Sequence, residues 1–284
     1  MKPSPFDYAK PSSLDEALGL LDTGGGNAVV LAGGQSLMPT LNMRLSSPSL
    51  LVDINDLQEL EGINVAGGII RIGALTRHKF VETSTDIARH VPLIAMAMPY
   101  IAHPAIRNRG TFGGSIALAD PAAELPACLL ALGAEIEIAG ANGRRKVPAG
   151  EFFKDLYQTD LADDELLTAV EIPLPAEGYQ SAFEELARRH GDYAMTGLAA
   201  HAKVDGNNVS DLRLAFFAVS GTPVLASNAS ATADGKDVND ETIAAIQESL
   251  EIDLEPFDDL NCSAKTRMLY ARELTGRVLR TLVA

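Results

Sequence analysis

The 284-residue chain has no tryptophan, only two cysteines and a marked shortage of basic side chains. Its 23 Lys and Arg residues stand against 38 Asp and Glu residues, which gives a formal net charge of −15. A surface this acidic repels phosphate backbones, so nucleic acid is not expected as a partner. Two cysteines are too few for an iron–sulfur cluster, which usually takes about four thiolates, or for a Cys-rich zinc site. Cys128 and Cys262 are therefore expected to be reduced and buried.

Long apolar runs are also missing. The longest, residues 91–102, contains Pro92 and Pro99 and falls short of the roughly 20 residues that a membrane span requires. No apolar segment of a secretory signal follows the N-terminus, so the chain is expected to be cytoplasmic, with no membrane span. Its 46% of hydrophobic residues is too high for a disordered chain. Its length predicts two or three modules of roughly 100 residues each.

Short strands and helices are mixed without a regular βαβ rhythm, which predicts an α+β fold. Ser13 is a candidate N-cap, with Glu16 three residues later. Turns are expected at Gly67-Gly68 and at residues 205–208, each between two strands. The other expected strands are residues 28–32, 50–54, 134–138 and 165–172. The other expected helices are residues 76–82, 90–101, 125–132, 240–249 and 264–282.

Residues able to bind a ligand gather in two glycine-rich segments. The first glycine loop, residues 32–37 (AGGQSL), follows an apolar run, and the second, residues 107–115 (RNRGTFGGS), is itself basic. Glycine lets a backbone approach a ligand closely, and successive N–H groups in such turns form a concave nest for phosphate oxygens. The hydroxyls of Ser36, Thr111 and Ser115 can add further donors. Two such loops on one chain suit a ligand with two phosphates, such as a dinucleotide.

Common motifs for other chemistry are absent from the sequence. Nothing fits the G-x-G-x-x-G or G-x-x-x-x-G-K-[ST] nucleotide motifs, and no G-x-S-x-G nucleophile elbow is present. The five histidines show no metal-ligand spacing, so no metal site is expected on this chain. No catalytic acid, base or nucleophile is predicted either.

Several motifs together resemble the FAD-binding (medium) subunit of molybdenum hydroxylases. The likeness is strongest to the medium subunit of the aerobic carbon monoxide dehydrogenase type, and it weakens after about residue 205. The motifs occur in the order expected for that family. They are residues 32–37 (AGGQSL), 51–55 (LVDIN), 72–74 (IGA), 107–115 (RNRGTFGGS) and 119–126 (ADPAAELP).

The resemblance implies an FAD-binding fold of the vanillyl-alcohol oxidase (PCMH) type with a C-terminal α+β domain. An N-terminal α/β domain (residues 1–58) and a middle α+β domain (59–175) would hold FAD, and a C-terminal domain (176–284) would close over the flavin. In such complexes a large subunit carries a molybdenum cofactor and a small subunit carries [2Fe–2S] clusters, in a dimer of heterotrimers. The flavin subunit takes electrons from the clusters and passes them to an external acceptor.

The resemblance also implies a role for each residue of the site. Both glycine loops hold the diphosphate, Ile101 lies near the isoalloxazine and Leu167 packs on the adenine. Either Glu124 or Asp120 accepts hydrogen bonds from the ribose hydroxyls. The residues expected to bind FAD are Ala32, Gly33, Gly34, Gln35, Ser36, Leu37, Ile101, Thr111, Gly113, Gly114, Ser115, Asp120, Glu124, Leu167 and Tyr193.

Tyr193 belongs to residues 188–194 (RRHGDYA), which resemble the loop of the family that covers the flavin. Its ring is expected to stack on the isoalloxazine. Nearby the chain departs from its xanthine-oxidising relatives, which carry a lysine where Glu184 stands. That difference leaves the stabilisation of the reduced flavin and the use of NAD open.

Two other functions remain open at the level of the sequence. A self-sufficient FAD oxidase of the same wider fold would need a substrate pocket above the flavin, usually under a longer cap domain. A non-catalytic binding module would carry the glycine turns without any cofactor. The substrate of the complex is also open, and N-heterocycles, aldehydes, purines and carbon monoxide are all candidates.

Overall fold

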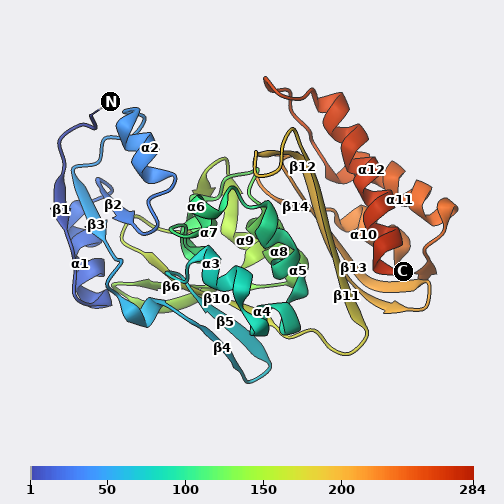
Figure 1. The fold of residues 1–284 in the computed structure, drawn as a ribbon, viewed down its shortest axis with the longest axis horizontal. Helices are drawn as coiled ribbons and strands as arrows, with labels where there is room; N and C mark the ends of the chain where they lie inside the picture. The colour runs from blue at the N-terminus through green and yellow to red at the C-terminus, as the bar shows by residue number, and fades with distance from the viewer. Residues whose placement is uncertain (1) are drawn as a thin grey trace.

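The computed structural model describes residues 2–284, which form three main β-sheets and one small two-stranded sheet, with helices between and around them (Figure 1). The N-terminal sheet is parallel, in the order β1-β3-β2. Its part of the chain contains β1 (Asp7–Ala9), α1 (Leu14–Gly24), β2 (Ala28–Leu31), α2 (Leu37–Asn42) and β3 (Leu50–Asp53). Helix α1 begins as predicted, because the Ser13 hydroxyl accepts a hydrogen bond from the Glu16 N–H. The Glu16 carboxylate, however, binds Ser12.

The middle sheet is antiparallel, in the order β4-β5-β10-β6-β7. Its central strand β10 is buried along almost its whole length, which explains its run of apolar residues. The strands of this part are β4 (Ile63–Ala66), β5 (Ile69–Gly73), β6 (Glu135–Gly140), β7 (Gly143–Pro148), β8 (Phe153–Asp155), β9 (Gln158–Thr159) and β10 (Leu166–Pro173). Its helices are η1 (Gln58–Leu60), α3 (His78–Thr83), α4 (Thr85–His90), α5 (Pro92–Ala97), η2 (Met98–Tyr100), α6 (Pro104–Arg107), α7 (Phe112–Leu118), α8 (Glu124–Leu132) and α9 (Ala149–Phe152).

The prediction of one helix over residues 90–101 is wrong. Helix α4 ends at His90, α5 begins at Pro92, and a 3₁₀ turn, η2, follows. Val91 lies outside the helical region, with φ −137° and ψ 62°, because the ring of the proline after it disfavours a helical conformation there. The helices at 125–132, 240–249 and 264–282 are confirmed, with boundaries that differ by no more than a few residues.

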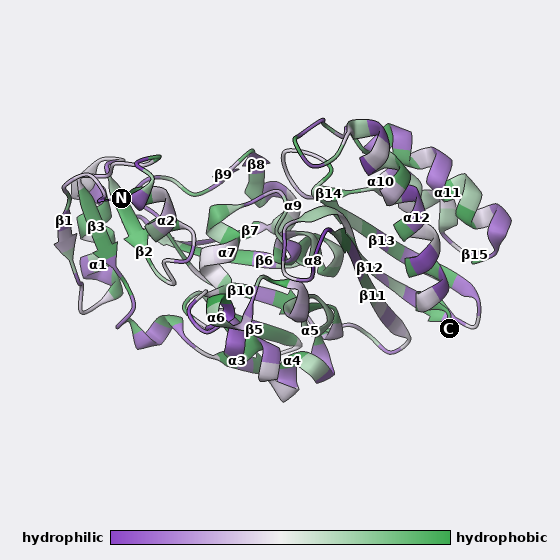
Figure 2. Cartoon of the chain, turned by 45° about the horizontal axis from the view of Figure 1, so that its top comes forward, coloured by the Kyte–Doolittle hydropathy of each residue, from purple (hydrophilic) through white to green (hydrophobic). Residues whose placement is uncertain are grey.

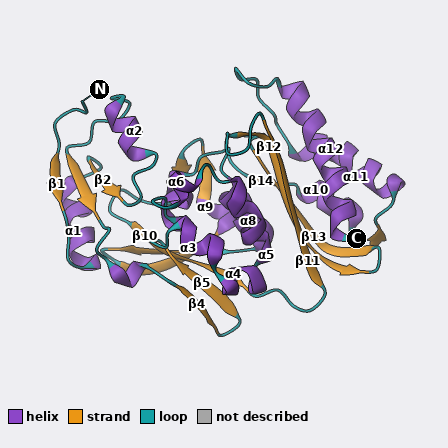
Figure 3. Cartoon of the chain, in the orientation of Figure 1, coloured by secondary structure: helices purple, strands orange, loops and turns teal. Residues whose placement is uncertain are grey.

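The C-terminal sheet is antiparallel and lies between two groups of helices (Figure 3). Helices α5 and α8 of the middle part pack on one face, and α10 and α12 pack on the other. Helix α12 carries both hydrophobic and hydrophilic residues, as its mixed colours show (Figure 2). The elements are β11 (Tyr179–Ala187), β12 (Ala194–Asp205), β13 (Asn208–Phe217), β14 (Val224–Leu225), α10 (Ser227–Ala233), β15 (Lys236–Asp237), α11 (Asp240–Asp253) and α12 (Ala264–Leu282).

The predicted α+β fold is confirmed by this mixture of sheets and helices. One hydrophobic core joins the middle part to the C-terminal sheet, because it contains residues such as Leu129 of α8 together with Phe217 of β13. A second core lies between that sheet and helices α10–α12. Within residues 2–284, no helix has both the length and the apolar character needed to cross a bilayer.

Gly197 of β12 tests this packing. A Cβ atom there would lie 2.0 Å from Cζ of Phe217, whose ring stacks on Phe183 with 5.7 Å between centroids. We expect Gly197→Ala to lower the free energy of unfolding by about 1–3 kcal/mol, the usual cost of overpacking a core. Gly19→Ala in α1, where a Cβ meets nothing within 4 Å, should instead be neutral or stabilising. Urea denaturation of both variants measures the difference, and equal stabilities would contradict this packing.

Candidate functional site

The two glycine loops, about 75 residues apart in the sequence, touch each other in the fold. A Cβ atom on Gly33 would lie 2.5 Å from the carbonyl oxygen of Arg109 and 2.9 Å from Cα of Gly110. Only a residue without a side chain permits so close an approach of two backbones. One ligand can therefore contact both loops.

The first glycine loop presents free backbone donors. Within residues 2–284, the N–H groups of residues 33–37 donate no hydrogen bond to the protein. Gly34 has φ +70°, a conformation that glycine adopts without strain. The side chain of Gln35 donates to the Gly33 carbonyl at 3.0 Å, which holds the loop in shape. Ser36 is exposed, and its hydroxyl does not cap α2. Successive free N–H groups of this kind form an anion-binding nest.

The second glycine loop is organised differently from the expected nest. Gly113, Gly114 and Ser115 lie in the first turn of α7, which Thr111 caps by accepting from the Gly114 N–H at 3.2 Å. The Gly113 N–H donates to the Ala74 carbonyl at 2.9 Å. The expectation that both loops offer open N–H groups is therefore wrong for these two glycines. The hydroxyls of Thr111 and Ser115 remain as donors at this loop.

A close approach to Ala74 explains why residue 113 is a glycine. A Cβ atom there would lie 2.5 Å from Cβ of Ala74, in the segment that follows β5. Ala74 in turn donates its N–H to the Thr168 carbonyl of β10 at 2.9 Å. Backbone hydrogen bonds through Ala74 thereby connect the second glycine loop to the middle sheet.

A hydrogen-bond network that the sequence did not reveal connects the two glycine loops. The guanidinium of Arg77 donates both to the Arg109 carbonyl and to Oδ1 of Asn55, the latter at 2.6 Å. The amide of Asn55 donates to the Ala32 carbonyl at 2.9 Å and to Asp53 at 2.6 Å. Residues 51–55 are one of the motifs of the family resemblance, but no local pattern marks Arg77 as the partner of Asn55. This hydrogen-bond network holds the first glycine loop against the second.

Ile101 also lies close to residues 188–194, which are called the covering loop. Ile101 is buried, with 8% of its surface exposed, and its carbonyl accepts from Arg107 at 3.0 Å. Arg107 is itself buried and forms an ion pair with Glu82. Gly191, with φ +83°, lies so close to this segment that a Cβ atom would be 2.8 Å from the His103 ring. The 188–194 segment therefore packs on residues 101–103.

Asp120, Glu124 and Tyr193 line the same region. Asp120 and Glu124 are buried, with 8% and 9% of their surfaces exposed, while Tyr193 is 73% exposed. Asp120 accepts from the Tyr157 hydroxyl at 3.3 Å. Desolvation raises the pKa of Tyr193, and the nearby charges of Asp120 and Glu124 raise it further. Burial also raises the pKa of Glu124 to about 7. An exposed tyrosine beside two buried carboxyl groups suits a ligand with an aromatic ring and hydroxyl groups.

A third carboxyl group, which the sequence did not single out, lies near Glu124. Glu185 of β11 is 9% exposed, and its Oε2 atom has no hydrogen-bond partner within residues 2–284. Burial, together with the charge of Glu124, raises the pKa of Glu185 to about 8. Its neighbour Glu184 instead pairs with Arg277 at 2.9 Å.

Leu167 is an expected site residue that lies deep in the fold. Only 3% of its surface is exposed, and it packs in the core of the middle part on β10. Its contact with an adenine therefore stays a prediction, as do the ligand contacts of the other expected site residues. No group of His, Cys, Asp and Glu in the described part of the chain has the arrangement of a metal site.

The raised pKa of Glu185 predicts how stability changes with pH. The folded protein keeps a proton on Glu185 up to about pH 8, whereas the unfolded chain loses it near pH 4.3. Because the folded state then binds more protons, the free energy of unfolding of the FAD-free protein should fall between these values. The fall is on the order of a few kcal/mol, at about 1.4 kcal/mol per pKa unit. Glu185→Gln should flatten this slope in urea titrations, and Glu184→Gln should keep it. An equal slope in wild type and Glu185→Gln would contradict a neutral buried Glu185.

Comparison with known proteins matches two family models along the chain. Residues 4–175 match the FAD binding domain in molybdopterin dehydrogenase, and residues 181–282 match the CO dehydrogenase flavoprotein C-terminal domain. The chain is 40% identical over 280 residues to the 6-hydroxypseudooxynicotine dehydrogenase complex subunit alpha of Paenarthrobacter nicotinovorans, covering 98% of this chain and 95% of the relative. It is 36% identical over 280 residues to the caffeine dehydrogenase subunit beta of a Pseudomonas species, with the same coverage.

The fold has solved counterparts as well. It superposes on carbon monoxide dehydrogenase from Hydrogenophaga pseudoflava with a TM-score of 0.96 and 37% identity, covering 99% of this chain and 98% of that chain. The predicted resemblance and the predicted FAD-binding fold are therefore confirmed. FAD is the cofactor that these matches support, and the free N–H groups beside two abutting glycine loops fit its diphosphate. The chain belongs to the family of FAD-binding medium subunits of molybdenum hydroxylases.

Proposed function

We propose that this chain is the electron-transfer subunit of a three-subunit oxidoreductase. It would take electrons from [2Fe–2S] clusters on a small subunit and pass them to an external acceptor, while a large subunit with a molybdenum cofactor oxidises the substrate. The observation that carries this proposal is the contact of Gly33 with Arg109 and Gly110 beside five free N–H groups. It provides one binding place for a diphosphate that joins the two halves of FAD.

The relatives support the proposed assembly. One is named as a subunit of a dehydrogenase complex, and another as a carbon monoxide dehydrogenase medium chain. The solved enzyme of Hydrogenophaga pseudoflava is described as lacking the Mo-pyranopterin moiety of its molybdenum cofactor. Because Cys128 and Cys262 are both free and buried, iron–sulfur clusters belong on a partner. We extend the proposal to a dimer of heterotrimers in the cytoplasm.

The residues of this chain have binding and orienting roles. The N–H groups of residues 33–37 and the hydroxyls of Ser36, Thr111 and Ser115 would bind the diphosphate oxygens. Asp120 or Glu124 would accept hydrogen bonds from ribose hydroxyls, and Tyr193 would cover one face of the ring system. FAD, when bound, supplies the ability to exchange electrons one or two at a time. Holding FAD in a fixed orientation with one edge open then requires no acid or base from this chain.

Tyr193 and Ile101 lie in different parts of the chain, so both parts would be needed to enclose the flavin. Tyr193 precedes β12 of the C-terminal sheet, whereas Ile101 follows η2 of the middle part. The contact of Gly191 with His103 brings the two segments together. The C-terminal part would therefore complete the site, and a truncated chain ending near residue 175 would leave the flavin uncovered.

Gly33→Ala tests the diphosphate site. The new methyl group would push the first loop away from Arg109, so we expect FAD affinity to fall roughly tenfold or more, which corresponds to 1.4 kcal/mol or more. The Gly19→Ala variant, whose new Cβ atom in α1 would meet nothing within 4 Å, should bind FAD like the wild type. Fluorescence titration of the FAD-free chains measures both affinities. Unchanged FAD binding by a folded Gly33→Ala variant would contradict the assigned site.

Native purification with metal analysis tests the proposed assembly. We expect FAD, Mo and Fe to co-elute with this chain and two further chains, at about one Mo and four Fe per FAD if the small subunit holds two [2Fe–2S] clusters. Anaerobic reduction of the complex by its substrate should then bleach the flavin absorbance only when the small subunit is present. A lone yellow chain that oxidises an organic substrate by itself would contradict the proposal and favour the self-sufficient oxidase.

A further inference from the structure

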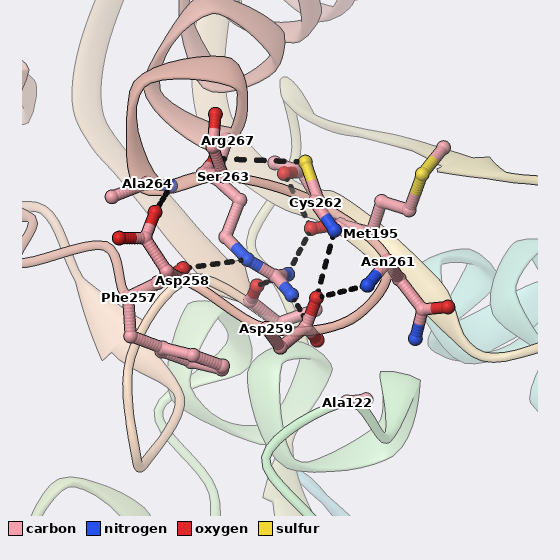
Figure 4. A network of polar contacts seen from close by, with 12 residues as sticks. Ala122, Met195, Phe257, Asp258, Asp259, Asn261, Cys262, Ser263, Ala264 and Arg267 are labelled. Atoms are coloured by element: carbon pink, nitrogen blue, oxygen red, sulfur yellow. Dashed lines mark hydrogen bonds and ion pairs between the residues drawn. The ribbon is translucent and has the colours of Figure 1, made fainter.

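A buried arginine lies behind the covering loop, where it joins three segments of the C-terminal part. Arg267 of α12 is 2% exposed. Its guanidinium donates to the carbonyl oxygens of Met195 and Ala218, and its Nε donates to the carbonyl of Phe257 at 3.1 Å. Figure 4 shows the Arg267 side chain between Met195, Phe257 and Asp259. Three of its five N–H groups are thereby used.

The charge of Arg267 is balanced within the same network. Its Nη2 pairs with a carboxylate oxygen of Asp259, and its guanidinium lies 4.6 Å from the centroid of the Phe257 ring. The other oxygen of Asp259 accepts from the N–H groups of Asn261 and Cys262 at 2.7 and 2.8 Å (Figure 4). A buried guanidinium needs such partners, and its planar fork fixes their relative positions.

Two of the carbonyls that Arg267 binds, those of Met195 and Ala218, lie next to segments of the proposed flavin site. Met195 lies two residues after Tyr193. Ala218 donates its own N–H to the carbonyl of Pro121 at 2.8 Å, directly after Asp120. Ala218 has φ +58°, a region that residues with a side chain rarely adopt, so its orientation depends on the contacts around it. One guanidinium therefore links the backbone beneath Tyr193 to the backbone beside Asp120 and Glu124.

We propose that Arg267 is a positioning residue of the flavin site, which sets how closely Tyr193 stands over the pocket formed by Asp120 and Glu124. This inference rests on the proposed function, since it needs FAD in that pocket. Arg267 is buried behind β12 and β13, so we do not expect it to contact FAD itself. It acts through the backbone of Met195 on Tyr193 and through the backbone of Ala218 on the Asp120 segment.

The test uses full-length chains saturated with FAD, so that differences in affinity do not affect the signal. A tyrosine stacked on a flavin quenches its fluorescence and shields it from iodide. Tyr193→Ala should therefore raise the fluorescence of bound FAD several-fold. Arg267→Lys, which keeps the charge but lacks the planar fork, should raise the fluorescence and the iodide quenching constant at least twofold. Adding Arg267→Lys to Tyr193→Ala should bring no further rise, because both changes remove the same contact.

Two further variants separate positioning from general stability. Arg272→Lys, on the same helix, loosens an arginine that binds the Gln247 carbonyl and Glu251 on α11, and it should leave the flavin signal at the wild-type value. Asp259→Asn keeps Arg267 but removes its carboxylate partner. It should shift the signal in the same direction as Arg267→Lys, and it decides the matter if Arg267→Lys does not fold.

The outcomes against the inference are distinct. Wild-type fluorescence in both Arg267→Lys and Asp259→Asn, beside a clear rise in Tyr193→Ala, would overturn the role of Arg267 and leave FAD binding intact. An effect of Arg267→Lys that adds fully to that of Tyr193→Ala would overturn it too. No rise in Tyr193→Ala would remove the residue through which Arg267 is proposed to act. Failure of the wild-type chain to bind FAD would instead overturn the proposed function.

Discussion

The contact between two backbones at Gly33 and Arg109–Gly110 is the constraint on which the site depends. It brings the loop that follows β2 against the loop that precedes α7, and a methyl group on Gly33 would clash with the Arg109–Gly110 backbone. Arg77 and Asn55 secure this contact by hydrogen bonds to the Arg109 and Ala32 carbonyls. The free N–H groups of residues 33–37 therefore lie near Thr111, the residue that caps α7.

The two glycine loops share a composition but differ in what their glycines do. In the first loop the glycines leave N–H groups unpaired and let the backbone turn, so the chain itself can act as the anion receptor. In the second loop Gly113 and Gly114 permit close packing against Ala74 and Thr111, and their N–H groups are used internally. The same residue type thus serves binding in one loop and packing in the other. We therefore expect most of the backbone hydrogen bonds to the diphosphate to come from the N-terminal part.

Local patterns predicted much of the fold from the sequence. The Ser13 cap, the turn at Gly67-Gly68 and the C-terminal helix 264–282 follow from neighbouring residues, and the structure confirms them. The helix over 90–101 failed because two prolines outweighed its apolar spacing. Arg77, Glu185 and Arg267 could not be found in this way. Their roles depend on partners 22 to 72 residues away in the sequence or on burial between parts of the fold, and no local spacing encodes either.

A crystal structure of the chain with FAD bound tests the central claim most directly. The account predicts diphosphate oxygens within hydrogen-bond distance, about 2.7–3.2 Å, of N–H groups in residues 33–37 and of the Thr111 or Ser115 hydroxyl at the same time. It also predicts that Gly33 keeps its contact with Arg109 and Gly110. A diphosphate bound to one loop alone, with the loops moved apart, would contradict the account.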